Sequence, residues 1–138
     1  MAEQLGGTLK VKARYGIYKD RDDRPVQQKI ALEHPEKIFN IYVELADGQF
    51  IEFFPMDESE DETDEGSRYS HFALLTDDLE KTVEELKAKG VPFDSEISKG
   101  PSGTWQIWSH DPDGNRFEIM QFTDDSWQVN GYGLDDRA

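Results

Sequence analysis

The chain has 138 residues, 36% of them apolar and 12% aromatic, which suits one domain with a single packed core. It contains no cysteine, which excludes disulfides and thiolate metal ligands, so any metal must be held by histidine, carboxylate, carbonyl or amide groups. The formal net charge of −15 excludes nucleic acid and anionic membranes as favourable partners. No apolar run resembles a leader or is long enough to span a bilayer, so we expect a cytoplasmic protein.

The N-terminal part of the chain is expected to be mainly β-structure. Residues 8–18 alternate between apolar and polar side chains well enough for a strand. Residues 25–33 are ambiguous, because Pro25 suits the start of a helix while Ile30 and Leu32 alternate as in a strand. We favour the strand, and we expect no amphipathic helix before the hairpin that follows.

A β-hairpin is predicted next, followed by an acidic linker. Residues 38–45 and 49–54 flank an Asp47-Gly48 pair, which is a strong hairpin-turn signal. The run from 57 to 65 consists almost entirely of Asp and Glu, so it repels itself and buries no apolar area. We interpret it as a solvated linker; a cation-binding loop is the weaker alternative, because the spacing matches no EF-hand.

The strongest helix signal in the sequence follows this linker. Residues 69–75 form a short apolar run that predicts a strand. Apolar residues then recur at helical spacing, which predicts a helix over about 77–89. Asp77 and Glu80 have the spacing of a capping box, and Gly90 stands where a helix-terminating glycine is expected.

Three further strands complete a β-α-β-β-β order. We expect them at 91–97, 104–108 and 116–122, with a tight turn over 111–115 in which proline fixes φ and glycine accepts a positive φ. The sequence thus predicts a single domain with four segments: an atypical first module (1–56), an acidic linker (57–66), a βαβββ second module (67–123) and a loosely packed C-terminal extension (124–138).

Several of these stretches resemble one protein superfamily. Ser70-His71-Phe72-Ala73-Leu74, the helix with Gly90-Val91, and the run Trp108 to Glu118 containing Asp-Pro-Asp-Gly-Asn-Arg-Phe-Glu are similar to the C-terminal module of the vicinal-oxygen-chelate superfamily. This superfamily contains glyoxalases, bleomycin-resistance proteins and extradiol dioxygenases. The stretch Ala46 to Phe54 looks like the end of the N-terminal module, so the resemblance covers about 38–123.

The resemblance implies an α+β fold in which paired βαβββ modules form a curled mixed sheet around a cleft. It also implies metal ligands on the first and last strands of each module. Matching residues are Glu52 on the last strand of the first module, and His71 and Glu118 on the first and last strands of the second. The fourth ligand, usually His or Gln on the first strand, has no match, and the first module is shortened.

The chemistry implied by this likeness is that of a metal-dependent lyase or isomerase of the lactoylglutathione-lyase type. Zn, Ni, Mn, Fe or Co would suit one His and two carboxylates, and the ion would polarise vicinal oxygens of a small substrate. Glu118 or Glu52 would be the catalytic group that moves a proton. Strand periodicity places Glu52 with Phe54 on one face, and Gln106 with Trp108 on another, so these side chains could line a common cleft.

Alternatives to this enzyme stay open. Gln106, Trp108, Phe54 and Arg14 are candidate substrate-binding residues. Trp108 and Phe54 would also serve a metal-free, bleomycin-resistance-like protein that traps a flat ligand between aromatic rings. A third possibility is a degenerate module that acts as an interaction domain. His71 alone could be an ordinary half-buried histidine, and a strand Trp is usually core. Since a shortened first module would leave a surface uncovered, we also expect a homodimer.

Overall fold

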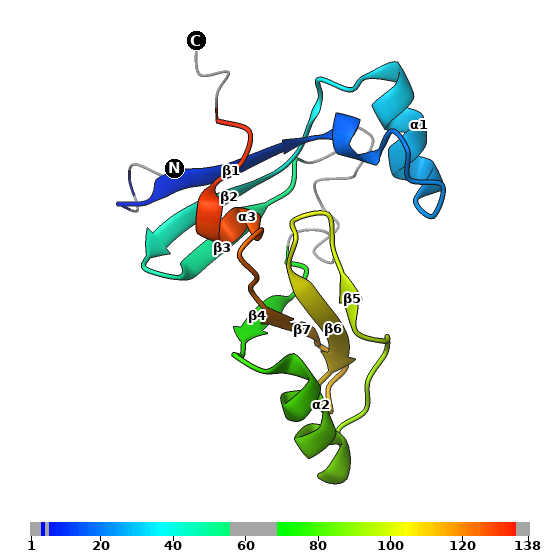
Figure 1. The fold of residues 1–138 in the computed structure, drawn as a ribbon, viewed down its shortest axis with the longest axis vertical. Coiled ribbons are helices and arrows are strands. Elements are labelled where there is room, and N and C mark those ends of the chain that lie inside the picture. The colour runs from blue at the N-terminus through cyan, green and yellow to red at the C-terminus, as the bar shows by residue number, and fades with distance from the viewer. Residues whose placement is uncertain (1–3, 5, 56–68, 135–138) are drawn as a thin grey trace. The chain divides into compact units, whose positions relative to one another are not determined.

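The computed structural model describes residues 4, 6–55 and 69–134, and the predicted acidic linker lies outside them. The chain forms two compact units, one made of residues 1–56 with 127–138 and the other of residues 57–126 (Figure 1). We call them the composite unit and the C-terminal module. Each has its own sheet, so the predicted α+β class is confirmed. None of the helices in the described part of the chain is long and apolar enough to cross a membrane.

The C-terminal module has the predicted β-α-β-β-β order. Its sheet runs β4-β7-β6-β5, with β4 parallel to β7 and the other neighbours antiparallel. The first strand of the module is therefore hydrogen-bonded to the last one. The elements are β4 (Phe72–Leu75), α2 (Leu79–Ala88), β5 (Ser98–Lys99), β6 (Trp105–His110) and β7 (Arg116–Gln121).

The core of this module lies between α2 and one face of the sheet. Leu79 and Val83 of α2 pack against Ile107 of β6 and Ile119 of β7, and all four side chains are at most 5% exposed. Burying one such side chain contributes about 1.5–3 kcal/mol. Because side chains alternate along a strand, the neighbours of Ile107 and Ile119 in β6 and β7 point to the opposite face of the sheet, away from this core.

The ends of α2 correct one prediction and confirm another. The N-cap is Asp78, whose carboxylate accepts a hydrogen bond from the Lys81 amide at 3.1 Å. The predicted capping box of Asp77 with Glu80 is therefore wrong by one residue. Asp77 and Asp78 carry the same side chain, so the sequence alone does not distinguish which of them is the N-cap. Gly90 follows the helix with φ of +84°, as expected for a residue that ends a helix in the left-handed region.

The strand expected over 91–97 is absent, and only Ser98–Lys99 pair as β5. Pro92 lacks an amide proton, so this stretch cannot form a regular ladder there. It follows β6 through isolated hydrogen bonds instead. Ser109 donates to the Pro92 carbonyl at 2.5 Å, and Ser95 accepts from the Trp108 amide at 3.0 Å. The Asp94 amide donates to the Trp108 carbonyl at 2.9 Å. The apolar residues of this stretch, among them Phe93, pack on the core.

The composite unit is built on an antiparallel sheet of order β1-β2-β3. The expected hairpin is confirmed, and Gly48 in its turn has φ of +73°. Since β2 lies between β1 and β3, the first strand of this unit does not touch the last. The elements are β1 (Thr8–Arg14), the short 3-10 helix η1 (Tyr15–Tyr18), α1 (Pro25–Glu33), β2 (Ile38–Ala46), β3 (Gln49–Phe53) and α3 (Trp127–Asn130).

The strand expected over 25–33 is wrong, because Pro25–Glu33 form helix α1. Proline occupies the first helical turn, where its fixed φ fits and no amide donor is needed. Gln28 ties the helix to the preceding loop by donating to Asp22 at 2.9 Å. Ala31 is buried, but Leu32 is 62% exposed, so α1 contacts η1 and does not cover the sheet (Figure 1).

Candidate functional site

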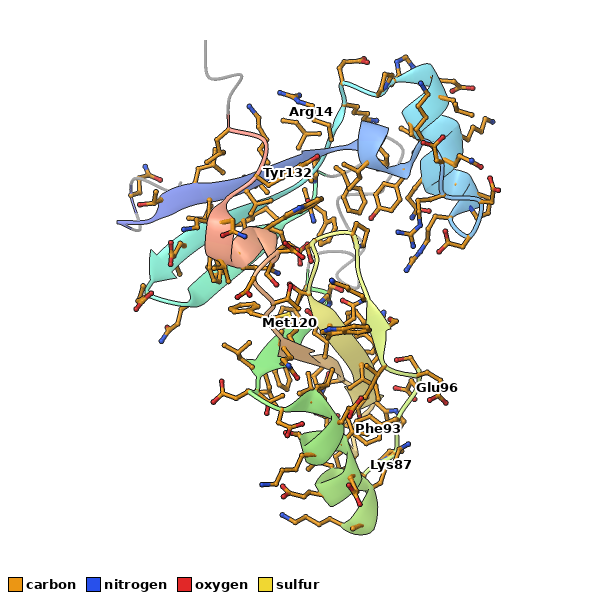
Figure 2. All side chains as sticks on the ribbon, viewed as in Figure 1. Arg14, Lys87, Phe93, Glu96, Met120 and Tyr132 are labelled. Atoms are coloured by element: carbon orange, nitrogen blue, oxygen red, sulfur yellow. The ribbon has the colours of Figure 1, made fainter. Side chains whose placement is uncertain are left out.

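The candidate site lies on the face of the C-terminal module opposite α2. Directly opposed residues in neighbouring strands share a face, and the ladder pairs Trp108 with Glu118 and Gln106 with Met120. Glu118 is in turn opposite Ala73 of the parallel strand β4. The predicted grouping of Gln106 with Trp108 is thus joined by Glu118 on one surface, and Figure 2 labels Met120 on the same strand.

His71 and Glu118 approach each other on this face. The expected strand over 69–75 begins only at Phe72, so His71 occupies the position before β4. Its Nε2 atom lies 3.9 Å from Glu118 Oε1, and the two side chains are 14% and 10% exposed. The parallel pairing of β4 with β7 is what brings them together: Phe72 lies opposite Phe117, so the residue before β4 lies beside the first half of β7.

The protonation state of His71 is set by its surroundings. Burial lowers the pKa of His71, and the nearby Arg116 guanidinium lowers it further. The imidazole is therefore neutral near pH 7, and its approach to Glu118 is not an ion pair at that pH. Ser70 Oγ lies 2.7 Å from Nδ1 of the same ring. In the tautomer with the proton on Nδ1, the Nδ1–H group donates a hydrogen bond to this hydroxyl, and Nε2 presents its lone pair.

Trp108 is the aromatic wall beside this pair. The His71 ring meets it edge to face with centroids 4.5 Å apart, and the Arg116 guanidinium lies 4.5 Å from the Trp108 centroid. The Gln106 amide lies next to Gly100, where an added Cβ would approach it to 3.6 Å. An amide, an indole, an imidazole and a carboxylate therefore share one half-buried surface.

Glu52 has a different environment in the composite unit. It stands opposite Tyr42 in the β2–β3 ladder, and its Oε1 accepts a hydrogen bond from the buried Asn40 amide at 2.5 Å. Burial raises the pKa of Glu52, while hydrogen bonds from Tyr42 and Asn40 oppose that shift. The Asn40 Oδ1 atom is buried and has no hydrogen-bond partner among the residues that the structure describes. Glu52 is thus held in a polar network on its own sheet.

The two remaining candidates also belong to the composite unit. Phe54 is 48% exposed and meets Phe39 edge to face at 5.5 Å. Arg14 donates from Nη1 to the Glu36 carbonyl at 2.7 Å. Grouping Glu52, Phe54 and Arg14 with the C-terminal module stays a prediction. Within residues 4, 6–55 and 69–134, no three His, Asp or Glu side chains converge as a metal-binding group.

Two residues next to the predicted site were given no role from the sequence. Ser70 orients the imidazole. In the sequence, only its position directly before His71 could have pointed to this role. Arg116 lies over the Trp108 ring. In the sequence, its position two residues before Glu118 could have placed it on the same face of the strand. The other histidines have other acidic neighbours: His34 Nδ1 is 3.7 Å from Glu36 Oε1, and His110 Nδ1 is 2.9 Å from Asp94 Oδ2.

Several known proteins match part of this chain. The probable chloroplastic lactoylglutathione lyase of Arabidopsis thaliana is 39% identical over 62 residues, which are 44% of this chain and 18% of that protein. A superfamily member from Sphaerobacter thermophilus is 24% identical with a TM-score of 0.35, covering 60% of this chain and 66% of that one. The fosfomycin resistance protein of Listeria monocytogenes is 23% identical with a TM-score of 0.35, covering 61% and 66%.

The family model gives the broadest match. It is described as the Glyoxalase/Bleomycin resistance protein/Dioxygenase superfamily, and it matches residues 2–119. This range includes the C-terminal module up to β7 and the three-stranded sheet of the composite unit. The resemblance inferred from the sequence is thereby confirmed, and the chain belongs to the Glyoxalase/Bleomycin resistance protein/Dioxygenase superfamily.

Proposed function

We propose that the protein is a glyoxalase-like, metal-dependent lyase or isomerase that acts on a small substrate with vicinal oxygens. The observation that carries this proposal is the His71–Glu118 pair, which lies beside Trp108 on the face opposite α2. A nitrogen and a carboxylate oxygen, both largely shielded from solvent, form a donor pair suited to a divalent transition metal.

The geometry of this pair fits a metal after a small adjustment. Two donor atoms that each lie about 2.0–2.2 Å from one ion are roughly 3–3.6 Å apart. His71 Nε2 and Glu118 Oε1 are 3.9 Å apart, so a modest side-chain rotation would bring both into range. The lowered pKa keeps the imidazole neutral, as a ligand must be, and Ser70 supports the tautomer with a lone pair on Nε2.

Each residue on this face has a role in the proposal. The bound ion, one of Zn, Ni, Mn, Fe or Co, would supply Lewis acidity toward the substrate oxygens. Glu118 would hold or move a proton at its carboxylate. Trp108 would pack against the substrate, while the Gln106 amide would orient it by hydrogen bonding.

Metal content tests this proposal without knowledge of the substrate. The purified protein, equilibrated with Zn²⁺ and dialysed, should retain stoichiometric metal by mass spectrometry. His71→Ala and Glu118→Gln should each lose it, whereas His34→Ala is the matched control, since His34 is an exposed histidine. Equal metal retention in His71→Ala and the unaltered protein would overturn the proposal.

A metal-free binding protein is the second candidate, and the network around Glu52 favours it. Hydrogen bonds from Asn40 and Tyr42 engage that carboxylate. With the other tautomer of His71, Nε2–H would face the Glu118 carboxylate, and the same face would present Trp108 to a flat ligand. Saturable quenching of tryptophan fluorescence by a flat cation in the presence of EDTA, lost in Trp108→Leu, would support this alternative.

Homodimerisation and a cytoplasmic location remain predictions. Strand β4 has one sheet neighbour, and its Phe72 and Leu74 side chains are 43% and 50% exposed, as expected for a surface that a second copy covers. Light scattering at micromolar concentration should give the mass of a dimer, and a monomer mass would contradict it. Fractionation of the native host tests location, since the Arabidopsis relative is described as chloroplastic.

A further inference from the structure

We propose that the candidate site takes substrates with a carboxylate group, which the guanidinium of Arg116 holds beside the His71–Glu118 pair. The inference rests on the proposed function, because it names the substrate class of that same face. It gives Arg116 a role of its own, separate from the proposed metal ligands. The strand ladder places this residue: Arg116 stands opposite His110, one position along the same face from the Trp108–Glu118 pair.

Arg116 supplies the positive charge of this face. Strands β6 and β7 contribute these side chains to it: Gln106, Trp108, His110, Arg116, Glu118 and Met120. Arg116 is the only permanent cation among them, so it matches a ligand with a single negative charge. The chain has 30 acidic and 15 basic residues, so its overall field repels anions. Attraction must therefore come from a cation in direct contact, since physiological salt screens charges beyond about 8 Å.

Trp108 positions the guanidinium without using its hydrogen-bond donors. The Arg116 Cζ atom lies 4.5 Å from the centroid of the indole, which is a cation–π contact. Among the residues that the structure describes, none accepts a hydrogen bond from this guanidinium or forms a salt bridge with it. Its N–H groups form a planar fork that matches the two oxygens of a carboxylate. The contact with Trp108 therefore restricts the fork and leaves its donors to a ligand.

Arg116 and His71 contact the same indole ring. The His71 ring centroid lies 4.5 Å from that of Trp108, as the guanidinium carbon does. Burial lowers the pKa of His71 and the charge of Arg116 lowers it further, so the guanidinium is close enough to act on the imidazole. One small molecule can therefore contact both groups. A cationic ligand would instead compete with Arg116 for the ring and be repelled by it.

The other end of the face suits an apolar body. Alternate residues on one face of a strand are roughly 6–7 Å apart, so Arg116, Glu118 and Met120 follow one another along β7. Leu75 of β4 stands opposite Met120, which Figure 2 labels, and is 52% exposed. A substrate with its carboxylate at Arg116 would place its reacting oxygens near Glu118 and its apolar part against Met120.

Two probes that differ in charge test the inference on metal-stripped protein in EDTA. Phenylglyoxylate carries vicinal oxygens and a carboxylate, whereas 1-phenylpropane-1,2-dione has a neutral acetyl group in place of the carboxylate. In ¹H–¹⁵N spectra, phenylglyoxylate should shift the Trp108 indole N–H saturably; the loss of this signal in Trp108→Phe identifies it. The dione should bind about tenfold more weakly, because it lacks the charge-assisted hydrogen bonds. Added NaCl should weaken phenylglyoxylate but not the dione.

Matched variants complete the test. Arg116→Gln should weaken phenylglyoxylate about tenfold. Its unchanged binding of the dione shows that the face is intact. Arg116→Lys keeps the charge but loses the planar fork, so it should recover only part of the affinity. Lys81→Gln, at an exposed lysine of α2, removes the same charge from the other side of the sheet and should change neither affinity.

None of these readouts depends on a bound metal, so they are separate from the metal-retention test of the proposed function. Equal binding of the two probes, no saturable shift at millimolar phenylglyoxylate, or unchanged affinity in Arg116→Gln would each overturn the inference. A protein that retains metal through His71 but binds both probes alike would refute the substrate class and leave the proposed function standing. Charge-selective binding that Arg116→Gln abolishes supports the inference whatever the metal content.

Discussion

The first strand of the C-terminal module, β4, is hydrogen-bonded to the last strand, β7, whereas in the composite unit β2 separates β1 from β3. This difference decides where ligand-like side chains can meet. In the module it aligns His71 with Glu118 at 3.9 Å. In the composite unit Glu52 faces Tyr42 of β2 instead, and no residue of β1 stands directly opposite it. Pairing the first strand of a module with its last is what brings His71 close to Glu118.

The helices of the two units also differ in how far they cover their sheets. Helix α2 covers one face of its sheet, so the module has a core on one side and the candidate site on the other. Helix α1 contacts η1 and leaves Leu32 62% exposed. Identical substitutions in the two helices should therefore have very different consequences.

The largest expected effect is that of Leu79→Ala in α2. Leu79 is 2% exposed in the core, so its truncation should lower the free energy of unfolding by about 2–5 kcal/mol. The matched change Leu32→Ala in α1 should alter stability by no more than about 0.5 kcal/mol. Urea denaturation followed by circular dichroism measures both. Similar losses for the two variants would mean that α1 is packed as tightly as α2.

A smaller effect is expected at the N-terminus of α2. Asp78→Ala removes the carboxylate that caps the Lys81 amide, which should cost about 1 kcal/mol. Asp77→Ala loses a charge near the same helix end but no capping bond, so it should cost about 0.3–0.5 kcal/mol at most. If thermal denaturation shows Asp77→Ala to be the more destabilising variant, the cap is Asp77, as the sequence suggested.

The smallest expected effect concerns Glu52, and it appears as a pH dependence. Because burial raises the pKa of Glu52 in the folded protein, the native state binds its proton more tightly than the unfolded chain does. Its contribution favours the native state below the unfolded pKa of about 4.3 and is lost as pH rises through the folded pKa. Glu52→Gln should therefore gain stability relative to the unaltered protein between pH 4 and 7.

Denaturation at these two pH values, with Glu44→Gln on the same sheet as the control, checks this. A lowered folded pKa would reverse the sign: the advantage of Glu52→Gln would then be larger at pH 4 than at pH 7. That result would show that hydrogen bonds from Asn40 and Tyr42 outweigh burial.

Local sequence patterns predicted the C-terminal module well. The features that revealed it depend on short-range chemistry: the helical spacing, the helix end at Gly90 and the turn after Asp111. In that turn, the Asp111 carboxylate accepts hydrogen bonds from the Asp113 and Asn115 amides at 2.9 and 2.8 Å. The stretch 25–33 was misread because α1 has little amphipathic character, so its alternation looked like a strand. Residues 91–97 were misread because their apolar side chains serve the core without a ladder.

The site was predictable only in part. Strand period placed Gln106 and Trp108 on one face, and the family likeness supplied His71 and Glu118. The pairing of β1 with β2 was not visible in the sequence, because strand order depends on long-range contacts that no local pattern encodes. The hydrogen bonds of Glu52 with Asn40 and Tyr42 follow from that order and were missed for the same reason.

The state of the His71 ring tests the central claim most directly. Long-range ¹H–¹⁵N spectra resolve the ring nitrogens of the three histidines in the chain. We predict that His71 is neutral at pH 7, titrates below about pH 6.5, and shows a coordination shift at Nε2 with one equivalent of Zn²⁺. The Glu118→Gln variant should weaken that shift. A His71 that titrates above pH 6.5 and does not respond to Zn²⁺ would contradict the account.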